Sequence, residues 1–120
     1  MVNVEFDERH GIVTLIPSGT LHADDFAKVA EMVDPYIAEH GKLGGIIIYT
    51  KTFPGWEDFS ALITHIRFVK EHHKHIGKVA LVSDTVIANF AKSIVSHFVR
   101  AEVATFDYRE LEAAQKWMMA

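Results

Sequence analysis

The feature that most constrains the fold is an uninterrupted apolar run near the middle of the chain, from Leu43 to Tyr49. It contains three consecutive isoleucines, Ile46 to Ile48, whose β-branched side chains favour extended backbone. A strand without polar alternation is expected to be buried on both faces, which is typical of a central strand in a parallel sheet. The run therefore predicts an α/β domain with helices on the faces of the sheet.

Two shorter strands and a helix are predicted before this run. Val2 to Phe6 alternates apolar and polar residues, and Ile12 to Ile16 follows a polar turn that ends in Gly11, so the two strands are expected to pair antiparallel. The spacing then becomes helical from about His22 to His40, with Pro35 predicting a kink or a break and Gly41 a stop. The inward stripe of this helix is Phe26, Val29, Ala30, Val33 and Ile37.

Strands and helices continue to alternate after the central run. Helices are predicted from about Trp56 to His75, where Gly77 follows as a stop, and from Ser83-Asp84-Thr85 to about Phe98, while short strands are predicted at Val79 to Val82 and Val103 to Phe106. Asp107 and Glu110 resemble a capping box before a last helix that turns Leu111, Ala114 and Trp117 or Met118 inward. The predicted order is ββαβαβαβα, about five strands and four helices in one domain over residues 1–120.

The composition excludes several function classes. A net charge of −4 and scattered basic residues argue against nucleic-acid binding, and the lack of cysteine removes disulfides, thiolate nucleophiles and cysteine metal sites. No apolar run approaches the roughly 20 residues of a membrane span. The first residues have neither a basic start nor a long apolar stretch, so no signal peptide is expected and a cytoplasmic location is the default prediction.

The loops that follow the parallel strands are where a site is expected, because ligands of open parallel sheets bind beyond the carboxyl ends of the strands. The most unusual of these loops runs from Thr50 to Trp56, where Phe53 and Trp56 flank a Pro-Gly turn. Aromatic residues on a stiff loop are good anchors for a partner or an apolar ligand. The alternative is that Trp56 folds back and packs against the start of its own helix.

Ser83 and Asp84 form the second candidate site, directly after a buried strand. The serine could accept a phosphoryl group, or the backbone amides at the helix start could bind an anion. The alternative is helix N-capping, which alone explains these residue types. There is no Gly-rich phosphate loop and no dinucleotide-binding motif in the chain.

The histidines and serines give no catalytic or metal motif. His65, His72, His73 and His75 lack the i, i+4 spacing of a helical metal pair and fit a solvated helix end better. No nucleophile-elbow motif surrounds any serine. We therefore expect no metal, no cofactor and no enzymatic activity, the alternative being an enzyme that pairs His22 with Asp84 at the strand ends.

The element order and three segments of the chain resemble the SpoIIAA-like bacterial proteins, which are also described as STAS/SEC14-type domains. The segments are Gly55-Trp56-Glu57-Asp58-Phe59 continuing through His65 to Lys70, then Lys78 to Asp84, and Ala101-Glu102-Val103. The resemblance implies a STAS-like fold for nearly the whole chain. Related anti-sigma-factor antagonists are switched by phosphorylation of a serine in an Asp-Ser-Ser-Gly type motif after the third strand, where this chain has Thr52-Phe53-Pro54-Gly55-Trp56.

Two functions remain open from the sequence besides the enzyme. The first is a non-catalytic interaction or regulatory module that binds a protein partner or a second copy of itself as a homodimer. The second, suggested by the SEC14-type resemblance, is a carrier of a small apolar or lipid-like ligand. The candidate binding residues for either function are Phe53, Trp56, Asp58, His22, Ser83 and Asp84.

Overall fold

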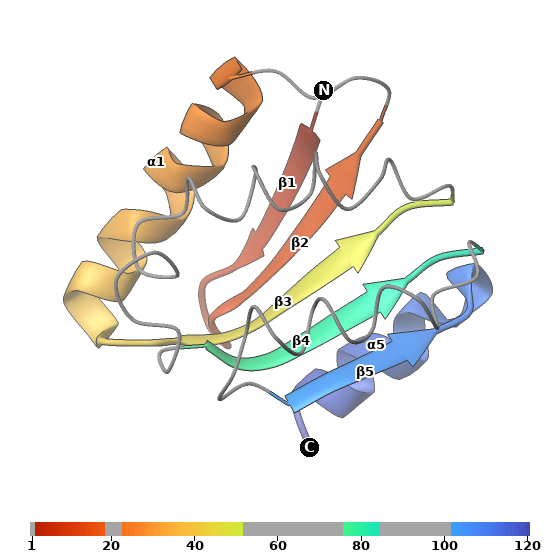
Figure 1. Cartoon of the computed structure of the whole chain (residues 1–120). Helices are drawn as coiled ribbons and strands as arrows, with labels where there is room; N and C mark the ends of the chain where they lie inside the picture. The colour runs from red at the N-terminus through yellow and green to blue at the C-terminus, as the bar shows by residue number, and fades with distance from the viewer. Residues whose placement is uncertain (1, 19–22, 52–75, 85–101) are drawn as a thin grey trace.

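The computed structural model describes residues 2–18, 23–51, 76–84 and 102–120 of the chain (Figure 1). The elements in chain order are β1 (Val2–Asp7), β2 (Ile12–Pro17), α1 (Ala23–His40), β3 (Leu43–Tyr49), β4 (Ile76–Val82), β5 (Glu102–Phe106), the 3-10 helix η2 (Tyr108–Glu110) and α5 (Leu111–Met118). All five strands belong to one sheet, in which their spatial order is the same as their order in the chain.

The predicted mixed sheet is confirmed. β1 pairs antiparallel with β2, and β2, β3, β4 and β5 pair parallel with one another. The described elements differ from the predicted order in having no helix between β3 and β4 or between β4 and β5, so two α-helices are described rather than four. The helices predicted from about 56 to 75 and from about 85 to 98 lie outside the described residues.

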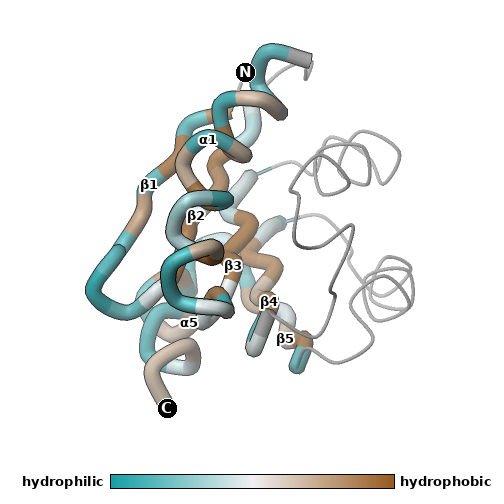
Figure 2. The backbone as a smooth tube through the Cα atoms, turned by 90° about the vertical axis from the view of Figure 1, so that its left-hand side faces the viewer, coloured by the Kyte–Doolittle hydropathy of each residue, from teal (hydrophilic) through white to brown (hydrophobic). Residues whose placement is uncertain are grey.

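The central strand β3 has the bounds that the apolar run predicted, Leu43 to Tyr49. Ile46, Ile47 and Ile48 are all completely buried, although successive side chains point to opposite faces of the sheet. Burial on both faces is what an apolar run without alternation requires, because each face needs its own cover. Figure 2 shows the same result as apolar residues that gather along β2, β3 and β4 in the interior.

Helix α1 covers the face of the sheet on which Phe6 of β1 lies. Val29, Val33 and Ile37 are buried, and the ring of Phe6 meets the ring of Tyr36 edge-on, with 5.1 Å between their centroids. The helix continues through Pro35, so the predicted alternative of a break there is wrong. Buried residues on both sides of the proline hold the two halves of the helix against the sheet, and this packing compensates for the hydrogen bond that proline cannot donate.

Helix α5 covers the opposite face. Ala114 and Met118 are buried in one cluster with Ile47 and Ala80, and Leu111 and Trp117 pack against that cluster, as the periodicity predicted. The capping box is also confirmed, although it begins the short helix η2 that leads into α5. The Asp107 carboxylate accepts a hydrogen bond from the Arg109 amide at 3.0 Å, and the Glu110 carboxylate accepts one from the Asp107 amide at 2.9 Å.

Three glycines define turns or strand starts. Gly11 in the β1–β2 turn and Gly41 after α1 have φ of +67° and +81°, a region that favours glycine, and both donate their amides to the preceding turn. Gly77, which was predicted to follow the helix as a stop, lies inside β4, which begins at Ile76. A Cβ at Gly77 would lie 2.9 Å from the Gly44 carbonyl oxygen, so the lack of a side chain lets the two strands approach there.

Candidate functional site

The carboxyl ends of the parallel strands lie at one edge of the sheet. We call the part formed by three of them the carboxyl edge: Thr50 and Lys51 after β3, Ser83 and Asp84 after β4, and Asp107 after β5. Backbone hydrogen bonds continue across this edge beyond the strands. Thr50 donates to Val82 at 3.1 Å, and Asp84 donates to Lys51 at 3.2 Å. The loops after β3 and β4 are therefore fixed to each other as extensions of the sheet.

Two hydroxyl side chains are buried at the carboxyl edge. Thr50 is 6% exposed and Ser83 is 3% exposed. The Ser83 hydroxyl donates to the Lys51 carbonyl at 3.4 Å, and its amide donates to Phe106 at 3.1 Å. Lys51 and Asp84, by contrast, are exposed. The edge thus combines a hydrogen-bonded base with a cationic and an anionic side chain that are open to solvent.

The structure brings two of the predicted site residues, Ser83 and Asp84, to this edge. The other four, Phe53, Trp56, Asp58 and His22, lie outside the described residues, so the aromatic-anchor hypothesis stays a prediction. The same holds for the pairing of His22 with Asp84 in an enzyme. Lys51 was part of the loop that the sequence singled out, but its role beside Asp84 became visible only from the pairing of the two loops.

The anion-binding and phosphoacceptor hypotheses at Ser83 receive no support from its geometry. The amides of Ser83 and Asp84 both donate to backbone carbonyls, so these two donors are occupied within the sheet edge. The Ser83 hydroxyl is buried and is used in the same contact between loops. Ser83 serves in this arrangement as a buried connection between β3, β4 and β5.

The strand order of the described sheet also bears on which ligands the edge suits. Ligand crevices in open α/β sheets lie at a switch point, where the order of the strands reverses. The order of the five described strands is sequential, so it contains no such reversal.

Two cavities are lined by described residues, and no residue of the carboxyl edge lines either of them.

A pair of tyrosines lies beside this edge on the face that α5 covers. The rings of Tyr49, at the end of β3, and Tyr108, in η2, stack with their centroids 4.7 Å apart and their planes 7° from parallel. Hydrogen bonding to Tyr108 raises the pKa of Tyr49, and burial adds to the same direction. The sequence did not single out this pair, because its members are 59 residues apart and neither lies in a motif.

The two described histidines have partners of their own. His10 Nδ1 lies 2.7 Å from the Asp7 carboxylate, and this hydrogen bond lowers the pKa of Asp7. His40 Nδ1 lies 3.0 Å from the Tyr36 carbonyl oxygen, and its ring stacks on the Tyr36 ring. Within residues 2–18, 23–51, 76–84 and 102–120, no three histidine or carboxylate side chains gather where they could hold a metal ion.

The two cavities lie on opposite faces of the sheet. One, of about 400 Å³, lies beside α5 and is lined by residues that include Glu5, Thr14 and Met119. The other, of about 560 Å³, lies beside α1, between Phe6 and side chains that include Met32 and Glu39. Sequence reasoning missed both. A signal for the first was present, namely a threonine in the otherwise apolar second strand, opposite acidic residues of the first.

These observations define a small α/β domain with a mixed five-stranded sheet that is covered on its two faces by α1 and α5, an arrangement that fits the expected STAS-like fold. The profile of the SpoIIAA-like family matches residues 12–119, and the chain belongs to this family. No curated protein and no solved structure shows a significant match to the chain. Of the helices in the described ranges, none has the length and apolar character that crossing a membrane requires.

Proposed function

We propose that this protein is a non-catalytic interaction module of STAS type that binds a protein partner at the carboxyl edge and acts in the cytoplasm. The observation that carries the proposal is the structure of that edge. Lys51 and Asp84 are exposed, while the backbone beneath them is fixed by the hydrogen bond from Asp84 to Lys51. A partner that meets both charges finds the backbone that carries them already fixed, which reduces the entropy lost on binding.

Membership of the SpoIIAA-like family supports the general class of regulatory or interaction domain. The opposite charges of the edge support a protein partner, because charges of both signs on a fixed backbone give complementarity and orientation across an interface. A second copy of the chain is one such partner. The aromatic residues Phe53 and Trp56 follow Lys51 closely in the sequence and remain candidate contacts for such a partner.

The alternative function, carriage of an apolar or lipid-like ligand, finds no specific support in the two described cavities. Both have carboxylates in their walls, Glu5 and Asp7 in one and residues such as Glu8 and Glu31 in the other. An apolar ligand would have to bury or displace the water around these charges, which is costly. We therefore keep the interaction module as the first proposal.

Photo-crosslinking from the edge tests this proposal. A photoreactive amino acid is placed at Lys51 or at Asp84, and at Lys42 as the matched control. Lys42 is also an exposed lysine, but it precedes β3 and therefore lies at the opposite end of the same strand. In the native host cell, we expect the same crosslinked partner from positions 51 and 84 and not from position 42.

Charge-reversed variants then show whether the edge itself binds. Lys51→Glu and Asp84→Lys should each weaken capture of that partner, whereas Lys42→Glu should leave it unchanged. Sedimentation velocity of the purified protein shows whether the partner is a second copy, since a homodimer would dissociate in the first two variants. Equal crosslinking from all three positions, or loss of capture with Lys42→Glu alone, would refute binding at the carboxyl edge.

A further inference from the structure

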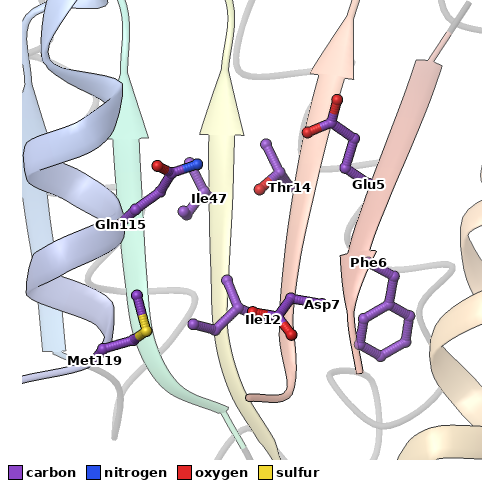
Figure 3. Close-up of a pocket in the computed structure, with 8 residues that line it drawn as sticks. All are labelled: Glu5, Phe6, Asp7, Ile12, Thr14, Ile47, Gln115 and Met119. Atoms are coloured by element: carbon purple, nitrogen blue, oxygen red, sulfur yellow. The ribbon is translucent and has the colours of Figure 1, made fainter. Parts of the chain in front are cut away.

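The cavity of about 400 Å³ beside α5 has a composition that points to a particular ligand chemistry (Figure 3). Its floor is the sheet, with Ile12 of β2 and Ile47 of β3. Glu5 and Asp7 of β1 form one wall, and Met119 at the end of α5 lines the other side. The charged residues that line the cavity are both carboxylates, so it favours a cation over an anion or a neutral ligand.

Thr14 is the feature that distinguishes this cavity from a patch of acidic residues. It lies between Glu5 and Ile47 on neighbouring strands, and its side chain faces the cavity (Figure 3). Thr14 is only 7% exposed, and no described residue forms a hydrogen bond with its hydroxyl. The hydroxyl oxygen is not itself fully buried, so it opens to the cavity, where a water or a ligand can pair with it.

Three oxygen acceptors from three elements therefore line the cavity: the Glu5 carboxylate from β1, the Thr14 hydroxyl from β2 and the Gln115 amide from α5. A primary ammonium group has three N–H donors and no acceptor. Ile12 on the floor and the exposed Met119 suit the aliphatic chain that carries such a group. The number and kind of the polar groups thus match one ammonium on an aliphatic stem.

Asp7 makes a smaller contribution than Glu5, because it is already engaged. Its carboxylate accepts hydrogen bonds from the His10 ring at 2.7 Å and from the His10 amide at 3.3 Å. Glu5 has no ion-pair partner among the described residues. The negative charge that is open to a ligand is therefore mainly that of Glu5.

We propose that this cavity is a binding site for a small aliphatic amine, whose ammonium group is held by Glu5, Thr14 and Gln115 and whose chain lies against Ile12 and Met119. The cavity is separate from the carboxyl edge, so amine binding can be tested independently of the partner proposed there. The same ammonium chemistry is present in the lysine side chain of a protein, and the test has to distinguish the two sources.

The test is a titration of the full chain with cadaverine, followed by amide chemical shifts in nuclear magnetic resonance spectra. We expect saturable shifts at β1, at Thr14 and at the end of α5. Hexanoate, which has a similar chain and a negative charge, should cause none. N-acetyl-lysine methylamide represents the lysine side chain of a protein in this titration, and we expect it to bind more weakly than cadaverine. Tighter binding of the lysine derivative would overturn the assignment to a free amine.

Variants test the roles of the individual residues. Glu5→Gln should weaken cadaverine binding about tenfold or more, whereas Glu31→Gln, which changes the net charge equally but lies on α1, should not. Thr14→Val should weaken binding while leaving the unfolding midpoint nearly unchanged, because the hydroxyl opens to the cavity and makes no hydrogen bond with the described residues. His10→Ala should strengthen binding, by up to about fivefold, because it frees the Asp7 carboxylate.

Three results would overturn the proposal. The first is the absence of saturable shifts with cadaverine. The second is an equal loss of affinity in Glu5→Gln and Glu31→Gln, which would show a general response to net charge. The third is a Thr14→Val variant that binds cadaverine as tightly as the unchanged chain. Because none of these variants lies at the carboxyl edge, they do not affect the crosslinking experiment.

Discussion

The contact between Gly45 and Met118 provides a direct test of how α5 is fixed on the sheet. Gly45 lies in the central strand with φ outside the region reserved for glycine, so its backbone can accept alanine. A Cβ added there would overlap the Met118 sulfur and would lie 3.0 Å from its terminal methyl carbon. A side chain at position 45 therefore requires the end of the Met118 side chain to shift.

The expected energies of the single substitutions follow from this contact. Gly45→Ala should destabilise the protein by about 1–2 kcal/mol, the cost of overpacking less the smaller gain from restricting the unfolded chain. Met118→Ala should cost about 2–3 kcal/mol, near the lower end for a buried methionine, because Met118 is at the margin of its cluster and 8% exposed.

The double variant Gly45→Ala/Met118→Ala tests whether the cost of the alanine at position 45 comes from the Met118 side chain. Once Met118 is shortened, the alanine at position 45 meets mainly the Lys78 carbonyl oxygen at 3.2 Å, a tight but small contact. Gly45→Ala should then be neutral or slightly stabilising, with a coupling of about 1–2 kcal/mol between the two sites. Urea unfolding followed by circular dichroism measures all four free energies. The reasoning is refuted if Gly45→Ala costs the same with and without the Met118 side chain.

Three further predictions concern the cap, the helix end and the tyrosine pair. Asp107→Ala should lower the unfolding midpoint by a few degrees at neutral pH, and the difference should disappear in acid, because the hydrogen bond from the Arg109 amide lowers the pKa of Asp107 and its contribution is lost as pH falls through that value. Asp107→Asn, which keeps a capping oxygen, is the control. Gly41→Ala should cost about 1 kcal/mol in urea unfolding, because φ of +81° strains alanine, and a neutral result would contradict this account. Tyr108→Phe should bring the pKa of Tyr49 down toward its ordinary value of 10.0, measured from its ring resonances. Since a raised pKa in the folded state stabilises below the unfolded value and is lost as pH rises through the folded one, the variant should also lose less stability than the unchanged chain in strong base.

The local elements could be predicted because each depends on neighbours in sequence. Leu43 to Tyr49 gave the central strand with its correct bounds, since an apolar β-branched run can be satisfied only by burial on both faces. Asp107 with Glu110 gave the capping box, and Gly41 gave the end of α1, because each requirement is met within one turn of backbone. The antiparallel start followed from the short turn at Gly11.

Other features depend on which distant segments meet, and only the tertiary structure decided them. Packing of residues on both sides of Pro35 kept α1 continuous, and pairing of β4 with β3 drew Gly77 into a strand. The pairing of Lys51 with Asp84 and the stacking of Tyr49 on Tyr108 depend on the parallel register, which sequence periodicity does not specify. The cavity around Thr14 is a further case. The apolar run predicted that the sheet would be buried. The point at which α5 ends over the sheet, however, determines which polar groups face a cavity, and the sequence does not specify that point.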